Sequence, residues 1–232
     1  MVPALAELVV ADEPGSWSAA GFTVDDDGVC RIATVRVRLV GPVFNGTRGI
    51  QGWALRGVDD GSIDGLVTVS ADDTSAHDTT GGSAAEPSGA PVHPNGVTSI
   101  DHVVVGTDDC DRTVRAFRMF GLEPRRTRRY EMNGRPMRQV FFRAGEVIVE
   151  LVGADAPDPA DTPTRRPRPA TFWGLAHVVA DIDATAAFLG DLTSAPKDAV
   201  QPGRRISTLD NHRLEMSVRT AFLSPRPPRP TA

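Results

Sequence analysis

Residues 100–105 (IDHVVV) are echoed by residues 175–180 (LAHVVA), and each copy opens a similar segment of about fifty residues. Such an internal repeat limits the folds open to a chain more than composition does, because each copy must form the same unit. After each opening comes a helical stretch that ends at a glycine, residues 109–120 in the first copy and 183–189 in the second. The openings therefore predict a strand followed by a helix in two copied modules.

Alternating strands follow each helix, and they close on residues 147–153 (VIVELVG) and 218–224 (VRTAFLS). Each module is thus expected to contain a strand, a helix and about three further strands. A worn third copy precedes them, since residues 6–12 (AELVVAD) align with the openings and residues 35–41 (VRVRLVG) with the closing strand. Residues 1–69 are therefore expected to form a shortened N-terminal module of the same kind.

The amino-acid composition predicts two connecting segments and a C-terminal tail. Residues 70–96 are rich in Ser, Thr, Gly, Pro and Ala and have little to bury, which predicts a flexible linker in which His77 and His93 are solvated. A second Pro-rich connection, residues 154–170, joins the full modules at 97–153 and 171–225. Residues 226–232 are expected to be a disordered tail.

The charge and apolar content exclude several classes of function. A net charge of −5 argues against nucleic acid as a partner, and no apolar run is long enough for a membrane span. The N-terminus has no secretory signal pattern, and Cys30 and Cys110 form neither a disulfide framework nor a thiolate metal motif. A cytoplasmic protein that binds a small molecule is the expectation.

Three ionisable side chains stand in otherwise apolar strands: His102, Glu150 and His177. Burying such a group without a partner costs free energy, so each is expected to face a partner, a metal ion or a wet cavity. If the two modules pair about a pseudo-twofold axis, their opening strands lie together and the two histidines face each other. Glu150 then reaches the same cavity from its closing strand.

The ordered set DHVVV, VIVELVG and GLAHVV resembles the vicinal oxygen chelate superfamily of glyoxalases, bleomycin-resistance proteins and extradiol dioxygenases. The resemblance covers residues 97–225 and implies an α+β fold of paired βαβββ modules, a glyoxalase-like domain that holds a small molecule in a cup. It further implies a metal site of His102, Glu150 and His177, with Glu150 also catalytic. Family members often dimerise, and a monomer or a homodimer is expected.

The fourth ligand position departs from the family pattern, because Ala221 stands where Glu150 stands in the first module. Two histidines and one carboxylate still suit Fe(II), Mn(II) or Zn(II). Two functions therefore stay open. The chain is a metal-dependent lyase, isomerase or dioxygenase acting on vicinal oxygens, or a metal-free binding protein of the bleomycin-resistance type. Arg138 and Arg205 adjoin cavity strands and are the candidates for binding a substrate anion.

Overall fold

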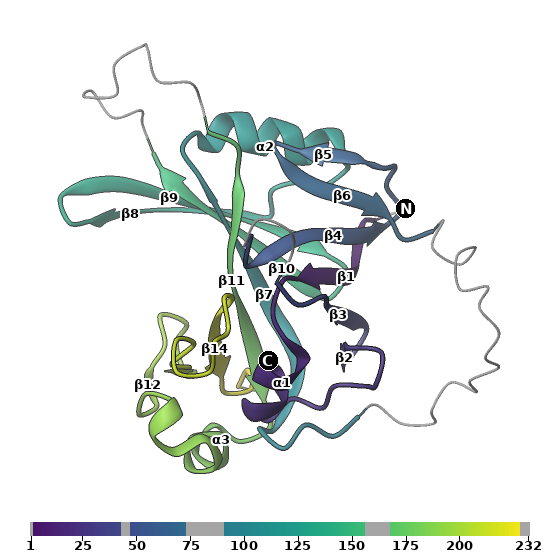
Figure 1. Cartoon of the computed structure of the whole chain (residues 1–232). Coiled ribbons are helices and arrows are strands. Elements are labelled where there is room, and N and C mark those ends of the chain that lie inside the picture. The colour runs from purple at the N-terminus through teal and green to yellow at the C-terminus, as the bar shows by residue number, and fades with distance from the viewer. Residues whose placement is uncertain (1, 43–46, 73–90, 156–167, 228–232) are drawn as a thin grey trace. The chain divides into compact units, whose positions relative to one another are not determined.

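The computed structural model describes residues 2–42, 47–72, 91–155 and 168–227 (Figure 1). The elements in chain order are β1 (Ala4–Val10), α1 (Pro14–Ala19), β2 (Val29–Ile32), β3 (Val35–Leu39), β4 (Ile50–Arg56), β5 (Gly61–Ile63), β6 (Leu66–Ser70), β7 (Val97–Thr107), α2 (Cys110–Met119), β8 (Arg126–Met132), β9 (Arg135–Ala144), β10 (Val147–Ala154), β11 (Thr171–Val179), α3 (Ile182–Leu189), η3 (Gly190–Leu192), β12 (Lys197–Asp198), β13 (Arg205–Thr208) and β14 (Arg219–Leu223). The two copied modules therefore follow the predicted βαβββ order.

The strands form two sheets whose orders repeat one pattern. The larger sheet runs β12-β13-β14-β11-β7-β10-β9-β8, and the smaller runs β2-β3-β1-β4-β6-β5. In the larger sheet β10 pairs parallel to β7 and antiparallel to β9. In the smaller sheet β6 pairs in the same way, parallel to β4 and antiparallel to β5. The shortened N-terminal module is therefore confirmed.

The helix ends repeat as well. Gly21 and Gly121 both follow a helix with a positive φ, 78° and 75°. The residue after each glycine donates its backbone N–H back to an aromatic residue of the helix, Phe22 to Trp17 and Leu122 to Phe117. Only glycine adopts this conformation without a steric penalty, so the aligned glycines mark the same helix-ending turn in both copies.

The chain forms two compact units, each drawn from several segments. The first contains the described parts of Met1–Val9, Ile50–Ser83 and His102–Gly174, and the second those of Val10–Gly49, Ala84–Asp101 and Leu175–Ala232. Each unit thus takes strands from the N-terminal region and from a full module. That residues 1–69 form a domain of their own stays a prediction.

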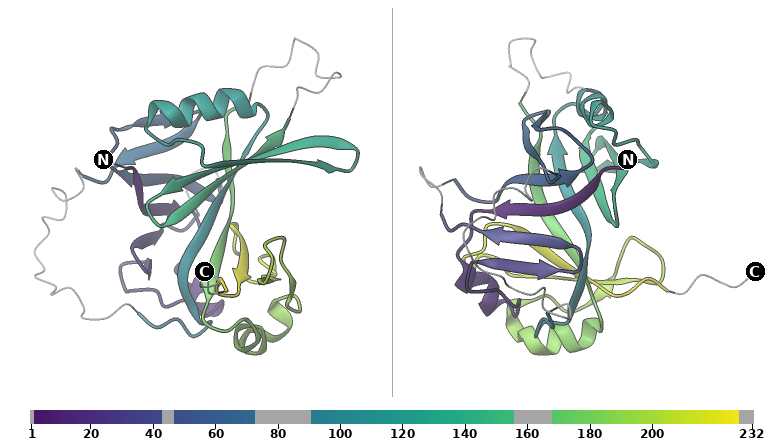
Figure 2. Two further views of the ribbon diagram at one scale, coloured as in Figure 1. Left: turned by 180° about the vertical axis from the view of Figure 1, so that it is seen from behind. Right: turned by 90° about the vertical axis from the view of Figure 1, so that its right-hand side faces the viewer.

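An aromatic cluster fills the core of the first unit. The Trp53 ring lies 5.1 Å from that of Phe172 and 6.2 Å from that of Phe117, and Phe117 lies 4.6 Å from Phe142. The buried Trp53 indole donates to Thr68 at 2.8 Å, so its polar atom is satisfied. This cluster packs beneath α2, which contacts β10 and β5 and is seen from two further sides in Figure 2.

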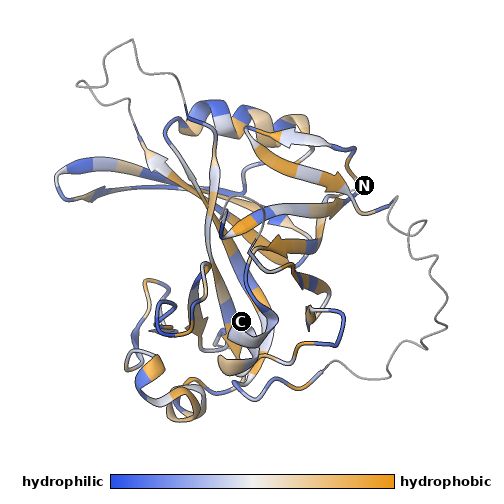
Figure 3. Ribbon diagram, viewed as in Figure 1, coloured by the Kyte–Doolittle hydropathy of each residue, from blue (hydrophilic) through white to orange (hydrophobic). Residues whose placement is uncertain are grey.

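The β8–β9 hairpin of the first unit is long and polar. Its strands pair from Arg126 and Phe141 out to Met132 and Arg135, and Figure 3 colours much of the hairpin as hydrophilic. Most of β8 is exposed. No helix among the described residues is long and apolar enough to cross a membrane.

The segment before β7 departs from the expected solvated linker. Residues 73–90, including His77, lie outside the described part of the chain, as do 156–167 of the second connection and 228–232 of the tail. His93 is buried, only 4% exposed, so the expectation of a solvated side chain is wrong. Its Nδ1 accepts from the Thr23 N–H and its Nε2 lies 3.1 Å from the Arg31 carbonyl oxygen. Burial lowers the pKa of His93, which favours the neutral ring that these two contacts require.

Candidate functional site

The strand β10 has one sealed face and one partly open face. Along β10, buried and half-buried residues alternate: every second residue from Val147 to Gly153 is buried, and every second residue from Ile148 to Ala154 is half-buried. The buried positions face α2, because a Cβ added at Gly153 would lie 2.8 Å from the Cys110 sulfur. Since neighbours along a strand alternate, Glu150 belongs to the opposite face. We call this side of β7, β8, β9 and β10 the open face.

Three polar side chains meet on the open face, each from a different strand. The Gln139 amide donates to Glu150 Oε1 at 2.6 Å, and His102 Nε2 lies 3.6 Å from Glu150 Oε2. The side chains of His102 and Glu150 are 16% and 15% exposed. Glu150 therefore has one oxygen near an amide donor and one near an imidazole, an arrangement that can hold a proton or a cation. The pKa of Tyr130 on β8 is raised, first by burial and second by the negative charge of Glu150.

A cleft of about 580 Å³ adjoins this cluster within the first unit. Val152 connects the two, since it lines the cleft and follows Glu150 by two residues on the same face of β10. The large apolar side chains of the cleft besides Val152 are Met132, Met137 and Trp173, and the charged ones are Asp108, Arg135 and Arg168. Trp173 is 55% exposed and Met132 is 49% exposed, so the cleft presents two large apolar side chains to solvent.

His177 lies in the second unit and has different surroundings. It is completely buried in an aromatic cluster, with its ring 5.2 Å from Phe22, 6.4 Å from Trp17 and 6.3 Å from Phe222. Trp17 in turn donates to the buried carboxylate of Asp12 at 3.1 Å. The structure thus brings His102 and Glu150 together and places His177 among aromatic rings.

The two predicted anion-binding arginines are already paired with carboxylates. Arg138 contacts Asp111 at 2.9 Å and Asp155 at 3.2 Å, and its neighbours Val140 and Phe142 at alternate positions of β9 are buried. Its side chain therefore faces α2 and not the open face. Arg205 pairs with Asp183 at 2.6 Å on the surface of the second unit. Their roles as ligand-binding residues stay predictions.

A metal site needs more donors than the contact between His102 and Glu150 supplies. Structural zinc sites use four protein ligands and catalytic ones use three. Within the described residues, no group of three or more His, Cys, Asp and Glu side chains could hold a metal ion. Ala221 is half-buried on β14 opposite Thr208, and its methyl group offers no donor. The donor set present does not fit a complete site, and the ligand set of His102, Glu150 and His177 stays a prediction.

Several residues of the site have no local signal in the sequence. Trp173 and Met132 stand on strands far apart in the chain, and only the sheet order brings them to one cleft. Gln139 carried a readable signal, because it alternates with Val140 on a strand next to that of Glu150. Arg168 stands at the end of a Pro-rich connection, where a solvated residue is the usual expectation.

Comparisons with known proteins agree on the fold. The family model described as the Glyoxalase/Bleomycin resistance protein/Dioxygenase superfamily matches residues 101–206. A solved mutant of 4-hydroxymandelate synthase from Streptomyces coelicolor aligns with 99% of this chain and 94% of its own, with a TM-score of 0.60 and 13% identity. A search of curated proteins gave no match.

Two methylmalonyl-CoA epimerases align over about half of the chain. The enzyme from Mycobacterium tuberculosis covers 57% of this chain and 91% of its own, with a TM-score of 0.42 and 17% identity. The enzyme from Streptomyces coelicolor covers 56% and 99%, with a TM-score of 0.41 and 23% identity. At these identities the likeness to the synthase shows the fold alone. The match over residues 101–206 confirms the predicted resemblance of this part of the chain to the glyoxalase, bleomycin-resistance and dioxygenase superfamily, and the likeness to the synthase agrees with the vicinal oxygen chelate fold.

Proposed function

We propose that the chain is a small-molecule binding protein whose ligand occupies the cleft on the open face of the first unit. The observation that carries this proposal is the cleft itself, which has a volume of about 580 Å³ and is lined by Met137 and by the exposed Trp173 and Met132. Ligand sites in proteins have volumes of about 300 to 1,000 Å³ and are mainly apolar, with a few polar groups. Indole and thioether side chains adapt to flat apolar ligands.

The neighbouring polar cluster gives the cleft a polar end. Glu150 is held by Gln139 and lies near His102, so a ligand that extends past Val152, which lines the cleft, would reach a carboxylate and an imidazole. These groups can accept or donate hydrogen bonds to a ligand oxygen or nitrogen. The proposed ligand is therefore amphipathic, with an apolar body against Trp173.

Binding of the uncharged fluorescent probe N-phenyl-1-naphthylamine tests this proposal. We expect the protein to enhance the fluorescence of the probe saturably, and Trp173→Ala to weaken its affinity about tenfold, because burial of one aromatic face contributes about 1.4 kcal/mol or more. The control is Phe188→Ala, which removes an aromatic ring that is 53% exposed and lies outside the cleft. Equal affinity in Trp173→Ala and wild type would rule out the cleft as the binding site.

A second candidate function is favoured by the contact between His102 and Glu150. In a metal-dependent lyase, isomerase or dioxygenase, these residues would hold a divalent ion together with His177, and the ion would act as a Lewis acid. This candidate requires a third donor to join the pair, since two donors bind a metal ion weakly.

Metal binding decides between the two candidates. For the binding protein, we expect protein purified without chelator to take up Zn(II), Mn(II) and Fe(II) only weakly, with the same isotherm for wild type, His102→Ala and Glu150→Gln. The enzyme candidate instead requires one ion per chain and loss of that ion in both variants and in His177→Ala. Isothermal titration and elemental analysis give both readouts, with Arg118→Gln as a surface control.

A further inference from the structure

Arg168 differs from several other arginines of the first unit in the contacts of its side chain. Within the first unit, Arg112, Arg129 and Arg138 each form an ion pair with an aspartate. The Arg168 guanidinium forms no hydrogen bond or ion pair with any described residue, although the residue lines the cleft. A charge left available at the wall of an apolar cleft is a feature of ligand recognition more than of folding.

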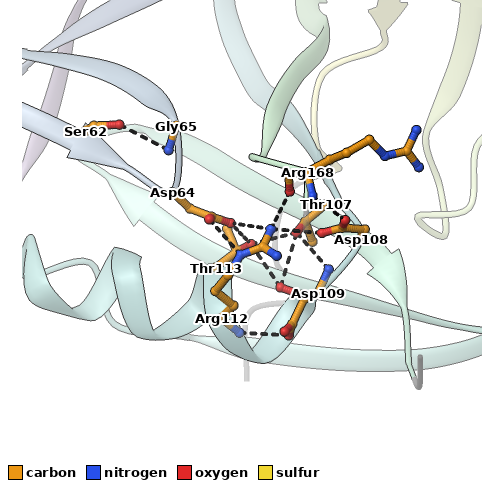
Figure 4. A network of polar contacts seen from close by, with 9 residues as sticks. All are labelled: Ser62, Asp64, Gly65, Thr107, Asp108, Asp109, Arg112, Thr113 and Arg168. Carbon is orange, nitrogen blue, oxygen red and sulfur yellow. Dashed lines mark hydrogen bonds and ion pairs between the residues drawn. The ribbon is translucent and has the colours of Figure 1, made fainter. Parts of the chain in front are cut away.

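The backbone of Arg168, in contrast, is held at both polar atoms. Its N–H donates to Asp108 Oδ2 at 2.8 Å, and its carbonyl oxygen accepts from Arg112 Nη2 at 2.7 Å. Figure 4 shows the Arg168 side chain extending away from these contacts, while the other residues turn toward one another. The residue is therefore anchored by its main chain and presents its guanidinium from a fixed point.

This anchor is built by the turn between β5 and β6. Asp64 accepts from Arg112 Nε at 2.7 Å and from Nη2 at 3.1 Å, and the Thr113 hydroxyl donates to it at 2.5 Å. The Asp64 carbonyl oxygen also accepts from the Ala170 N–H at 2.8 Å. We call Asp64, Asp108, Arg112 and Thr113 the rim clamp.

Gly65 brings the same turn against Pro169. A Cβ added at Gly65 would overlap the Pro169 ring, and the φ of Gly65 is +96°, so any side chain here would be strained. The residues on both sides of this contact, Asp64 and Arg168, are thereby fixed to each other. The position of Arg168 in the wall is set by packing as well as by hydrogen bonds.

Asp108, the acidic residue of the cleft, accepts hydrogen bonds from the Arg168 N–H and from Arg112. Burial by itself would raise the pKa of Asp108, but the hydrogen bonds from the Arg168 N–H and from Arg112 outweigh it and the pKa is lowered. Asp108 is therefore ionised, and it shares Arg112, at 2.9 Å, with Asp64. Arg168 lines the cleft together with Trp173, and its guanidinium takes part in none of these contacts.

Resting on the proposed function, we infer that the ligand of the cleft is an organic anion with a flat apolar body, and that Arg168 binds its carboxylate, phosphate or sulfonate group. Guanidinium groups bind such oxyanions through two parallel N–H donors. The apolar body lies against Trp173, Met132 and Met137, which line the same cleft. Arg168 therefore sets the charge of the ligand, and the apolar side chains set its shape.

A pair of probes that differ in charge tests the inference. The anionic probe is 1-anilinonaphthalene-8-sulfonate, and N-phenyl-1-naphthylamine is its uncharged relative. We expect Arg168→Gln to weaken affinity for the sulfonate about tenfold and to leave affinity for the neutral probe unchanged. Arg118→Gln is the matched control, because it removes the same charge from an exposed pair with Glu123 at the end of α2. Added salt should weaken only the sulfonate, since it screens the charge.

The outcomes separate the two proposals. If Arg168→Gln binds the sulfonate as wild type does, while Trp173→Ala still weakens the neutral probe, the anion inference is wrong and the binding function stands. If Trp173→Ala changes neither probe, both are wrong. Competition by benzoate and by phenyl phosphate then distinguishes a carboxylate from a phosphate as the preferred group.

Discussion

Replacing Asp101 with alanine is expected to lower the free energy of unfolding by about 3 to 5 kcal/mol, because it leaves a buried arginine charge without its carboxylate. The side chains of Arg204 and Asp101 are both only 2% exposed, and Arg204 Nη1 donates to Asp101 at 2.8 Å. The remaining described acceptors of Arg204 are neutral, the Ser224 carbonyl oxygen and the Gln201 amide oxygen. The burial of Arg204 cannot be relieved by rotation to solvent unless the packing of the second unit changes.

Urea denaturation followed by circular dichroism measures this loss. The double variant Asp101→Ala with Arg204→Met provides the control, since it removes both charges and keeps most of the apolar stem. We expect it to be more stable than Asp101→Ala alone. If the losses measured for Asp101→Ala and for Arg204→Met alone add up to the loss in the double variant, the ion pair does not account for the stability of this site.

The modular fold could be read from the sequence because its signals are local. The helix predicted over residues 109–120 is observed as α2, Cys110–Met119, and Asp109 caps it by accepting from the Arg112 N–H. The closing strand predicted over residues 147–153 is observed as β10, Val147–Ala154. A capping aspartate, a terminal glycine and a two-residue alternation each act within a few residues, so one sequence suffices to place them.

Of the two histidines on the opening strands, the side-chain orientation of His102 could be predicted from the sequence and that of His177 could not. Around His102 the alternation holds, because Val103 and Val105 are buried and His102 is half-buried. In β11 four consecutive residues, Gly174 to His177, are buried, so the alternation does not reveal which face His177 occupies. Its aromatic neighbours are distant in the chain, so no local sequence pattern predicts these contacts.

The sequence carries a local signal for the orientation of one arginine. Arg138 alternates with Val140 and Phe142, which are apolar enough to predict a core-facing side, and the structure places Arg138 on that side. For Arg168 the sequence holds no such signal. Its role depends on the turn at Asp64, more than a hundred residues earlier, which reaches it through Arg112.

That turn gives the last prediction. Replacing Asp64 with alanine is expected to lower the free energy of unfolding by about 2 to 3 kcal/mol, since it removes three hydrogen bonds to a carboxylate. The Asp64 side chain is only 10% exposed, and Arg112 keeps its second partner, Asp108, so the cost stays below that of an isolated buried charge. Asp64→Asn, which retains one acceptor oxygen, should lose about half as much.

The same variant should also weaken the binding of an anion. Without Asp64, Arg112 is no longer held where it donates to the Arg168 carbonyl oxygen, so Arg168 loses one of its two anchors. We expect affinity for 1-anilinonaphthalene-8-sulfonate to fall several-fold at a temperature where the variant remains folded, with the neutral probe less affected. Arg118→Ala, on the same helix but exposed, should change neither stability nor binding. If Asp64→Ala unfolds at the same urea concentration as wild type, the rim clamp does not stabilise the fold. One that is destabilised yet binds the sulfonate normally would show that the clamp supports the fold without positioning Arg168.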